Sequence, residues 1–209
     1  MYAPEGARRA VVAVLHGGFW RTPYAADLMD PLCDDLAARG YEVWNVEYRR
    51  VGADGGWPMT FDDVRAAVAN PEEPFVTLGH SAGGHLALWL AAERGAALAV
   101  SQAGVVDLVE AWRLSLSRRA PAELLGGTPD EVPDRYASAS PAARLPLGVP
   151  QLLVHGRRDD TVPAGMSRAY AERARQAGDD VEVVETDEGH FECLDPDSES
   201  WAAIVERLP

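Results

Sequence analysis

The chain contains 209 residues, of which 47% are hydrophobic. A chain of this length can bury enough surface to form one core, so we expect a single domain, residues 1–209. Its 33 acidic and 19 basic residues give a net charge of −14, which repels phosphate backbones and anionic lipid, so we expect no nucleic acid or membrane partner. The first ten residues lack an apolar signal sequence and no later segment approaches the length of a membrane span, which predicts a soluble, cytoplasmic protein.

Short β-rich runs alternate with segments of helical spacing along the chain. The expected strands are residues 10–15, 43–46, 75–78, 98–102, 151–154 and 181–185. The expected helices are residues 25–39, 61–69, 85–94, 164–177 and 198–208, and Gly40, Gly95 and Gly178 stand where C-caps would fall. This alternation predicts an α/β fold with a reduced, mostly parallel sheet of about six strands, flanked by helices on both faces.

One stretch, about residues 106–149, carries no convincing strand between two strands that should otherwise follow closely. An insertion of this length at the carboxyl side of a sheet usually overhangs the site, so we expect a short cap. The alternative is a group of packing helices far from any ligand.

The segment GHSAGG, residues 79–84, follows the apolar run FVTL and opens an Ala- and Leu-rich stretch. Strand, sharp turn and helix form the context in which G-x-S-x-G becomes a nucleophile elbow, so Ser81 is the candidate nucleophile. Gly79 and Gly83 lack the Cβ atoms that would collide where strand and helix cross.

A serine hydroxyl needs a base to remove its proton and an acid to orient that base. The candidate base is His190, because DEGHFE places it on a loop after the last strand. His80 and His85 are expected to point into packing, and His155, at a strand end, to be a structural hydrogen-bond partner.

The orienting acid should lie on the loop after the strand QLLVHG, where GRRDDTVP offers Asp159 and Asp160. Only one of them can face the imidazole, and the other is expected to cap the helix that starts near Pro163. Asp107, after the preceding strand, is the fallback acid. The order serine, aspartate, histidine is that of an α/β-hydrolase triad.

Two backbone N–H groups are needed to stabilise an oxyanion. Ala82, directly after the nucleophile, supplies the first, and the run HGGFW supplies the second from Gly18 or Phe19. These loops should open at the same switch point of the sheet. Cys33 and Cys193 fit neither a zinc site nor a disulfide framework, so we expect buried free thiols, no metal and no cofactor.

The motifs HGGFW, GHSAGGHLA, GRRDDTVP and DEGHFE stand in the order and spacing of the α/β-hydrolase superfamily, and the chain resembles a compact bacterial esterase or lipase. HGG followed by an aromatic residue and Trp is similar to the kynurenine formamidase (arylformamidase) branch. The resemblance implies that Ser81 is the nucleophile, His190 the base and Asp159, rather than Asp160, the triad acid.

Two departures bear on this resemblance. Hormone-sensitive-lipase relatives carry HGGG and GDSAGG where this chain has HGGF and GHSAGG, which disfavours that branch. The chain also begins almost on the strand before HGGFW, so the edge strand 41–48 is expected to be exposed or paired with another subunit in a possible homodimer.

The expected function is that of a metal-independent serine hydrolase that cleaves a small-molecule substrate, either a carboxylic ester or an N-formyl or similar amide, through an acyl-enzyme. The alternatives are a peptidase resembling the prolyl-oligopeptidase group and a non-catalytic α/β-hydrolase scaffold that binds a small ligand. Because the cap is short, the pocket should be shallow, with Phe19, Trp20 and Trp112 as aromatic walls.

Overall fold

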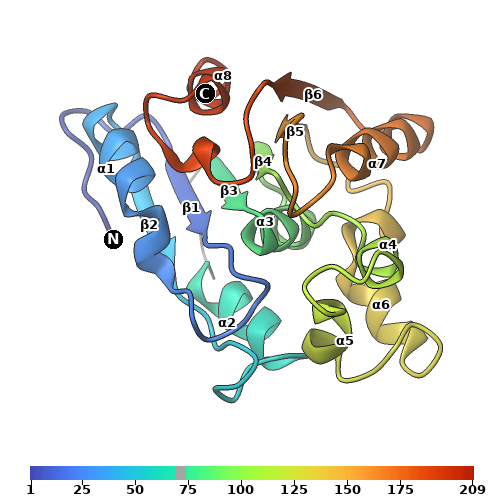
Figure 1. The fold of residues 1–209 in the computed structure, drawn as a ribbon. Helices are drawn as coiled ribbons and strands as arrows, with labels where there is room; N and C mark the ends of the chain where they lie inside the picture. The colour runs from blue at the N-terminus through green and yellow to red at the C-terminus, as the bar shows by residue number, and fades with distance from the viewer. Residues whose placement is uncertain (69–73) are drawn as a thin grey trace.

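A sheet of six parallel strands forms the centre of the computed structural model, which describes residues 1–68 and 74–209 (Figure 1). The strands are β1 (Val11–Leu15), β2 (Glu42–Val46), β3 (Phe75–His80), β4 (Leu98–Gln102), β5 (Gln151–Gly156) and β6 (Val181–Thr186). Their spatial order is β2-β1-β3-β4-β5-β6, and every neighbouring pair is parallel. The predicted α/β class and six-stranded sheet are confirmed.

The strand order reverses between β1 and β3. From β1 the chain moves outward to β2, then returns to the other side of β1 and continues through β3 to β6. Loops after strands on either side of such a reversal diverge and leave a crevice at the carboxyl edge of the sheet. The loops after β1 and β3 carry HGGFW and Ser81, so the topology itself brings these motifs together.

Helices cover both faces of the sheet, and alternate residues of the strands pack against them. On one face lie α1 (Asp30–Ala38) and α8 (Glu199–Val205), which pack on Val12, Val14 and their counterparts in neighbouring strands. On the other face lie α2 (Met59–Ala67), α3 (Ala82–Arg94) and α7 (Ala164–Gln176). Burial on both sides explains why β1, VVAVL, is a continuous apolar run and why every residue of β3 is buried.

Several helix boundaries differ from those predicted. The single helix expected over residues 25–39 is a 3-10 turn, Ala26–Met29, followed by α1, because Pro31 has no N–H to continue a preceding helix and is favoured in a first turn. Helix α3 begins at Ala82 rather than at residue 85, directly after the serine. The predicted end of the second helix, Ala69, lies outside the described residues.

The insertion between β4 and β5 holds α4 (Leu108–Arg113), α5 (Ala120–Leu125), α6 (Pro133–Ala139) and a 3-10 turn at Pro141–Ala143, with no strand among its residues, all of which are described. Figure 1 shows these helices gathered on the side of the molecule away from α1. Apolar side chains from α4, α5 and α6 join the same buried cluster as α3. Most of the insertion therefore packs as part of the core, and one loop of it, at Ser117 and Arg118, reaches the cavity described below.

The edge strand β2 is not fully open, contrary to what the sequence suggests. The backbone N–H of Tyr2 donates to the carbonyl oxygen of Val43 at 2.8 Å, and the N–H of Val43 donates back at 3.0 Å. This short antiparallel bridge lies on the side of β2 away from β1, so a segment of the same chain occupies part of the edge.

Both cysteines are buried and unpaired. Cys33 lies in α1 and Cys193 follows the loop of His190, and burial raises the pKa of the Cys33 thiol to about 12 and that of Cys193 further in the same direction. Among the described residues, no helix has the length and apolar character needed to cross a lipid bilayer.

Candidate active site

Ser81 occupies the sharp turn between β3 and α3. Its backbone has φ +55° and ψ −116°, a conformation that a residue with a Cβ rarely adopts. The side chain is 1% exposed, and its backbone N–H donates to the carbonyl oxygen of Gln102 in the neighbouring strand at 2.8 Å. This strained turn lifts the hydroxyl above the carboxyl end of the sheet, as a nucleophile elbow requires.

The turn is possible only because both flanking positions are glycines. A Cβ atom on Gly79 would lie 2.1 Å from the carbonyl oxygen of Gly83, and a Cβ on Gly83 would lie 2.0 Å from the carbonyl oxygen of Leu15. Both distances are far inside van der Waals contact, and both partners are backbone atoms that cannot rotate away. The two glycines thus set how closely α3 approaches β1 and β3.

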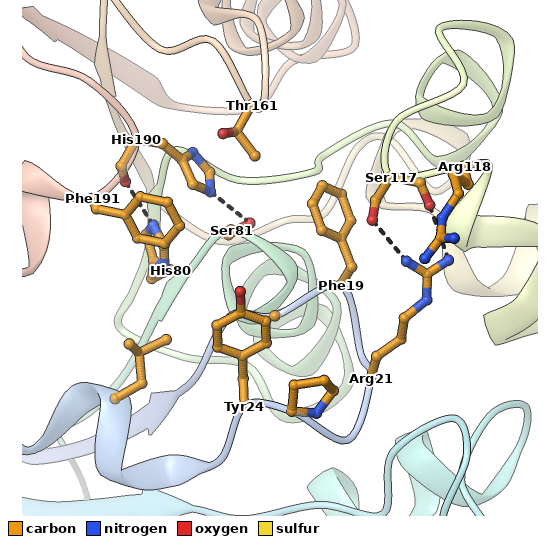
Figure 2. Close-up of a pocket in the computed structure, with 13 residues that line it drawn as sticks. Phe19, Arg21, Tyr24, His80, Ser81, Ser117, Arg118, Thr161, His190 and Phe191 are labelled. Atoms are coloured by element: carbon orange, nitrogen blue, oxygen red, sulfur yellow. Dashed lines mark hydrogen bonds between the residues drawn. The ribbon is translucent and has the colours of Figure 1, made fainter.

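A hydrogen-bonded chain runs from Ser81 through His190 to Asp159. The Ser81 Oγ lies 3.1 Å from His190 Nε2, and His190 Nδ1 lies 2.7 Å from Asp159 Oδ2 (Figure 2). The hydroxyl donates to Nε2, and Nδ1–H donates to the carboxylate. The three side chains come from the ends of β3, β6 and β5 and are almost completely buried, the geometry of a nucleophile, base and orienting acid.

Asp159 is held as a carboxylate by several donors. Its Oδ1 accepts from the backbone N–H groups of Thr161 and Val162 at 2.9 and 2.8 Å, and its Oδ2 accepts from His155 at 3.1 Å as well as from His190. Burial alone raises the pKa of this carboxyl, but the hydrogen bonds from the two histidines and the backbone outweigh it and hold the pKa well below its usual range.

Asp160 does not face His190. Its carboxylate accepts from the adjacent Thr161 hydroxyl at 3.2 Å. The expected capping role is also wrong, since α7 begins after Pro163 with no side-chain cap. The reason is that Asp159 itself binds the backbone of the turn that precedes the helix. The fallback acid, Asp107, is elsewhere: it caps α4.

His80 is nearer to the chemistry than its sequence context indicates. Its ring lies 4.7 Å from the ring of His190, and its Nε2–H donates to the His190 carbonyl oxygen at 2.9 Å. Burial and the neighbouring His190 lower the pKa of His80 to about 3, so it is neutral at physiological pH. The only sequence signal for this contact is its position next to Ser81.

The other two histidines of these segments are structural. His85 is buried in α3, where its Nε2–H donates to the Ala139 carbonyl oxygen at 2.9 Å and burial lowers its pKa to about 4. His155 is a hydrogen-bond partner, as expected, but of the acid itself: it contacts Asp159, and its Nδ1 accepts from the Ser167 hydroxyl at 2.8 Å.

The HGGFW loop passes directly over the serine. A Cβ on Gly17 would lie 3.2 Å from the Ser81 Cβ, and Gly18 and Phe19 both have positive φ, +107° and +49°. Among the described residues, the backbone N–H groups of Gly18, Phe19 and Ala82 have no hydrogen-bond partner. These donors beside the hydroxyl are what an oxyanion hole needs.

A cavity of about 380 Å³ opens beside Ser81. Figure 2 shows His190 and Phe191 on one side of the serine, Tyr24 below it, and Phe19, Arg21, Ser117 and Arg118 on the other side. Tyr24 and Phe191 are 43% and 53% exposed, so aromatic faces line the mouth of the cavity.

Trp20 and Trp112, predicted as pocket walls, do not line this cavity. Trp20 is completely buried and packs edge-on against His85 with ring centroids 5.2 Å apart. Its backbone also has positive φ, +59°, so the chain turns again after Phe19 and directs the second aromatic ring into the core. Trp112 lies in α4, and the Arg119 guanidinium packs over its ring. Phe19 is the predicted wall residue that lies on the cavity.

The HGGFW loop is tied to the insertion by one arginine. The terminal nitrogens of Arg21 donate to the hydroxyl and the carbonyl oxygen of Ser117 at 2.7 and 2.9 Å, and its Nε donates to Glu123 at 2.8 Å. The cavity wall formed by Ser117 and Arg118 is thereby fixed relative to the loop that covers the serine. In the described ranges, no group of three or more His, Cys, Asp or Glu side chains is arranged to hold a metal ion.

Comparison with known families and proteins gives the following matches. A model of the BD-FAE family matches residues 1–173, a range that includes Ser81 and Asp159 and ends before His190. The chain is 35% identical over 110 residues to the uncharacterized peptidase YtmA of Bacillus subtilis (strain 168), covering 50% of this chain and 42% of that protein. It is 26% identical over 200 residues to the esterase LipQ of Mycobacterium tuberculosis (strain ATCC 25618 / H37Rv), covering 83% and 47%.

Among solved structures, an acetyl ester-xyloside bifunctional hydrolase from Caldicellulosiruptor lactoaceticus superposes with a TM-score of 0.80 at 21% identity, covering 99% of this chain and 84% of that one. At this identity the likeness describes the shared fold. The chain spans about half the length of the curated relatives it matches.

Proposed function

This chain belongs to the BD-FAE family, and from that membership and the geometry around Ser81 we propose that it is a serine esterase that cleaves small carboxylic esters. The observation that carries the proposal is the unbroken hydrogen-bonded chain from Ser81 Oγ through His190 to Asp159. The likeness to the esterase LipQ supports it.

In the first step His190 Nε2 takes the proton of the Ser81 hydroxyl while Oγ forms a bond to the ester carbonyl carbon. The carbonyl oxygen becomes an oxyanion, which accepts hydrogen bonds from the N–H groups of Ala82 and of Gly18 or Phe19. Collapse of this intermediate breaks the bond to the leaving oxygen, and that oxygen takes the proton from His190. The products are the free alcohol and an acyl group on Ser81.

In the second step water attacks the acyl carbon, and His190 takes one of the water protons. The second oxyanion collapses, Ser81 regains its proton from His190, and the carboxylic acid leaves. Asp159 stays ionised throughout and stabilises the imidazolium that forms in each half-reaction.

The walls of the cavity favour a flat leaving group. Because His190 delivers a proton to the leaving oxygen, that group lies on the side of His190, where the exposed ring of Phe191 offers an apolar face. A cavity of about 380 Å³ suits a short acyl group. The likeness to the acetyl ester-xyloside bifunctional hydrolase of Caldicellulosiruptor lactoaceticus supports the same preference.

An aromatic N-formyl amide is the second candidate substrate, on the strength of the HGGFW motif and the aromatic residues around the cavity. An amide requires protonation of a poorer leaving group, but the same His190 lies in position to supply it. The likeness to the peptidase YtmA makes peptide bonds a third class to include in a substrate panel.

Labelling with a fluorophosphonate probe followed by peptide mapping tests the proposal. We expect one adduct, on Ser81, because the probe needs an activated serine beside an oxyanion hole. Ser81→Ala should abolish both labelling and the hydrolysis of phenyl acetate. Labelling at another residue, or undiminished labelling of Ser81→Ala, would show that the elbow is not the nucleophile.

A substrate panel then distinguishes the classes. We expect phenyl decanoate to show no gain in kcat/KM over phenyl acetate, since each methylene that stays in water forgoes about 0.8 kcal/mol of burial. Hydrolysis of N-formylkynurenine at a rate comparable to the best ester would support the formamidase candidate. Good ester turnover without formamide hydrolysis would leave a carboxylesterase.

A further inference from the structure

The side of the cavity away from His190 carries positive charge. Arg21 and Arg118 both line it, and none of the described residues that line the cavity is acidic. The charge of Arg21 is already engaged by Glu123, 2.8 Å from its Nε. Arg118 is exposed and forms no hydrogen bond, ion pair or aromatic contact within residues 1–68 and 74–209.

The loop that presents Arg118 is fixed in an uncommon conformation. Ser115, Ser117, Arg118 and Arg119 all have positive φ, between +41° and +62°. Such a backbone is disfavoured for residues with a Cβ and persists only where surrounding contacts hold it. The two hydrogen bonds from Arg21 to Ser117 supply such contacts. The backbone that carries the Arg118 side chain is therefore held in place beside the cavity.

The protein as a whole opposes the binding of anions. With a net charge of −14, it repels a negatively charged substrate at long range. Arg118, which has no partner among the described residues, reverses this effect locally at the rim of the cavity, because a guanidinium pairs with a carboxylate through charge-assisted hydrogen bonds. An uncharged acetyl ester offers no negative charge for this cation to pair with.

We propose that Arg118 selects esters whose acyl group carries a second, ionised carboxylate, the half-esters of dicarboxylic acids. The inference rests on the esterase function proposed above. His190 must deliver a proton to the leaving oxygen, so the leaving group lies toward His190 and Phe191. The acyl group then extends past Phe19 toward Arg118 on the opposite side of the serine (Figure 2).

Matched pairs of ethyl esters test the proposal. Ethyl hydrogen succinate is compared with ethyl butyrate, and ethyl hydrogen adipate with ethyl hexanoate, so each pair shares its leaving group and acyl carbon count. The measured quantity is the ratio of kcat/KM for the anionic and the neutral ester. In Arg118→Gln we expect this ratio to fall about fivefold for at least one pair, mainly through KM, as loss of a partly exposed ion pair implies.

Two variants serve as controls. Arg118→Lys keeps the charge and should keep most of the ratio, and its remaining preference should weaken as ionic strength rises. Arg113→Gln removes an exposed arginine of the same insertion that does not line this cavity, and it should leave the ratio at the wild-type value. An active enzyme in which all variants give the same ratio would overturn the proposal.

A third pair locates the carboxylate. Phenyl acetate and 4-acetoxybenzoate differ only by a carboxylate on the leaving group, and their ratio should not change in Arg118→Gln. If this ratio falls and the acyl-side ratios do not, Arg118 recognises the leaving group and the proposal is wrong. Absence of any Ser81-dependent ester hydrolysis would instead overturn the esterase function, and this inference with it.

Discussion

The imidazole of His80 packs against that of His190 and donates a hydrogen bond of 2.9 Å to the His190 backbone carbonyl oxygen. The same carbonyl oxygen accepts a weaker hydrogen bond from the Cys193 thiol at 3.3 Å. The residue before the nucleophile thus supports the loop that carries the base. Since His80 is neutral, it provides this support without placing a positive charge beside the imidazole that must accept a proton.

We expect His80→Phe, which keeps a ring of similar size but removes the N–H donor, to lower kcat about tenfold with little change in KM, because a displaced base loses near-attack geometry. Steady-state kinetics on phenyl acetate measure the two parameters separately. A rise in KM alone would mean that His80 acts only as a wall of the cavity. Circular dichroism and thermal unfolding should establish that the variant is folded.

The two adjacent aspartates should differ sharply. Asp159→Asn leaves His190 without the carboxylate that fixes its tautomer, and we expect kcat to fall by about 10⁴. Asp160→Asn is the matched control, since within the described residues its carboxylate forms a hydrogen bond only with the neighbouring Thr161 hydroxyl, and we expect a change of less than twofold. Equal losses in both variants would contradict the assignment of the acid.

The rate should depend on one ionisation in the acid limb of the pH profile. His190 accepts the serine proton only when its imidazole is neutral, so kcat/KM falls as pH falls. Asp159 stays ionised because its pKa lies well below the usual range, and His80 stays neutral because its pKa is about 3. We therefore expect the acid limb of log kcat/KM against pH to have a limiting slope of one. A slope of two would show that a second group of the site titrates.

The buried histidines should make the fold sensitive to mild acid. Their pKa in the unfolded chain is near 6.5, whereas burial lowers that of His80 to about 3 and that of His85 to about 4. Between these values the unfolded chain binds more protons, so the free energy of unfolding decreases as pH falls below about 6.5. Each histidine contributes about 1.4 kcal/mol per pH unit within that window.

Urea denaturation between pH 7 and pH 4.5 measures this dependence. His85→Gln should reduce the slope by about one proton, because its folded and unfolded states no longer differ in protonation at that position. A free energy of unfolding that stays constant over the range would show that the histidines are accessible to protons in the folded protein.

Two glycines, one in the first turn of α3 and one at its C-cap, should respond very differently to alanine. Gly83→Ala forces a Cβ to within 2.0 Å of the Leu15 carbonyl oxygen, so we expect a loss of more than about 4 kcal/mol, seen as an insoluble or unfolded protein. Gly95→Ala, at the C-cap of the same helix, has positive φ but no atom within 4 Å of the added Cβ, and should cost about 1 kcal/mol. Similar losses would contradict the close helix–strand crossing.

The repeating features of this fold could be predicted from the sequence. The alternation of short β-rich runs with helical segments located all six strands. It also indicated that HGGFW and GHSAGG lie at one edge of the sheet, and the strand order agrees. The proximity of Ser81, His190 and Asp159 follows from the same rule, because the carboxyl ends of parallel strands meet.

The directions of side chains in local turns could not be predicted, because the backbone conformation of a single residue decides where its side chain points. Phe19 faces the cavity while Trp20 faces the core, since both adopt left-handed backbone conformations that a string of letters does not reveal. The hydrogen bond of His80 and the position of Arg118 beside the cavity depend likewise on packing between segments that are remote in the chain.

Because both native cysteines are buried, a spectroscopic label can be attached selectively to a cysteine introduced at the surface. A thiol reacts with maleimides as the thiolate, and raised pKa values together with burial leave Cys33 and Cys193 with very little thiolate at neutral pH. A cysteine introduced at Leu114, which is 47% exposed on the insertion, should therefore be modified selectively. A fluorophore at that position would report whether the neighbouring loop of Arg118 shifts when a substrate enters, without removal of any native residue from the core.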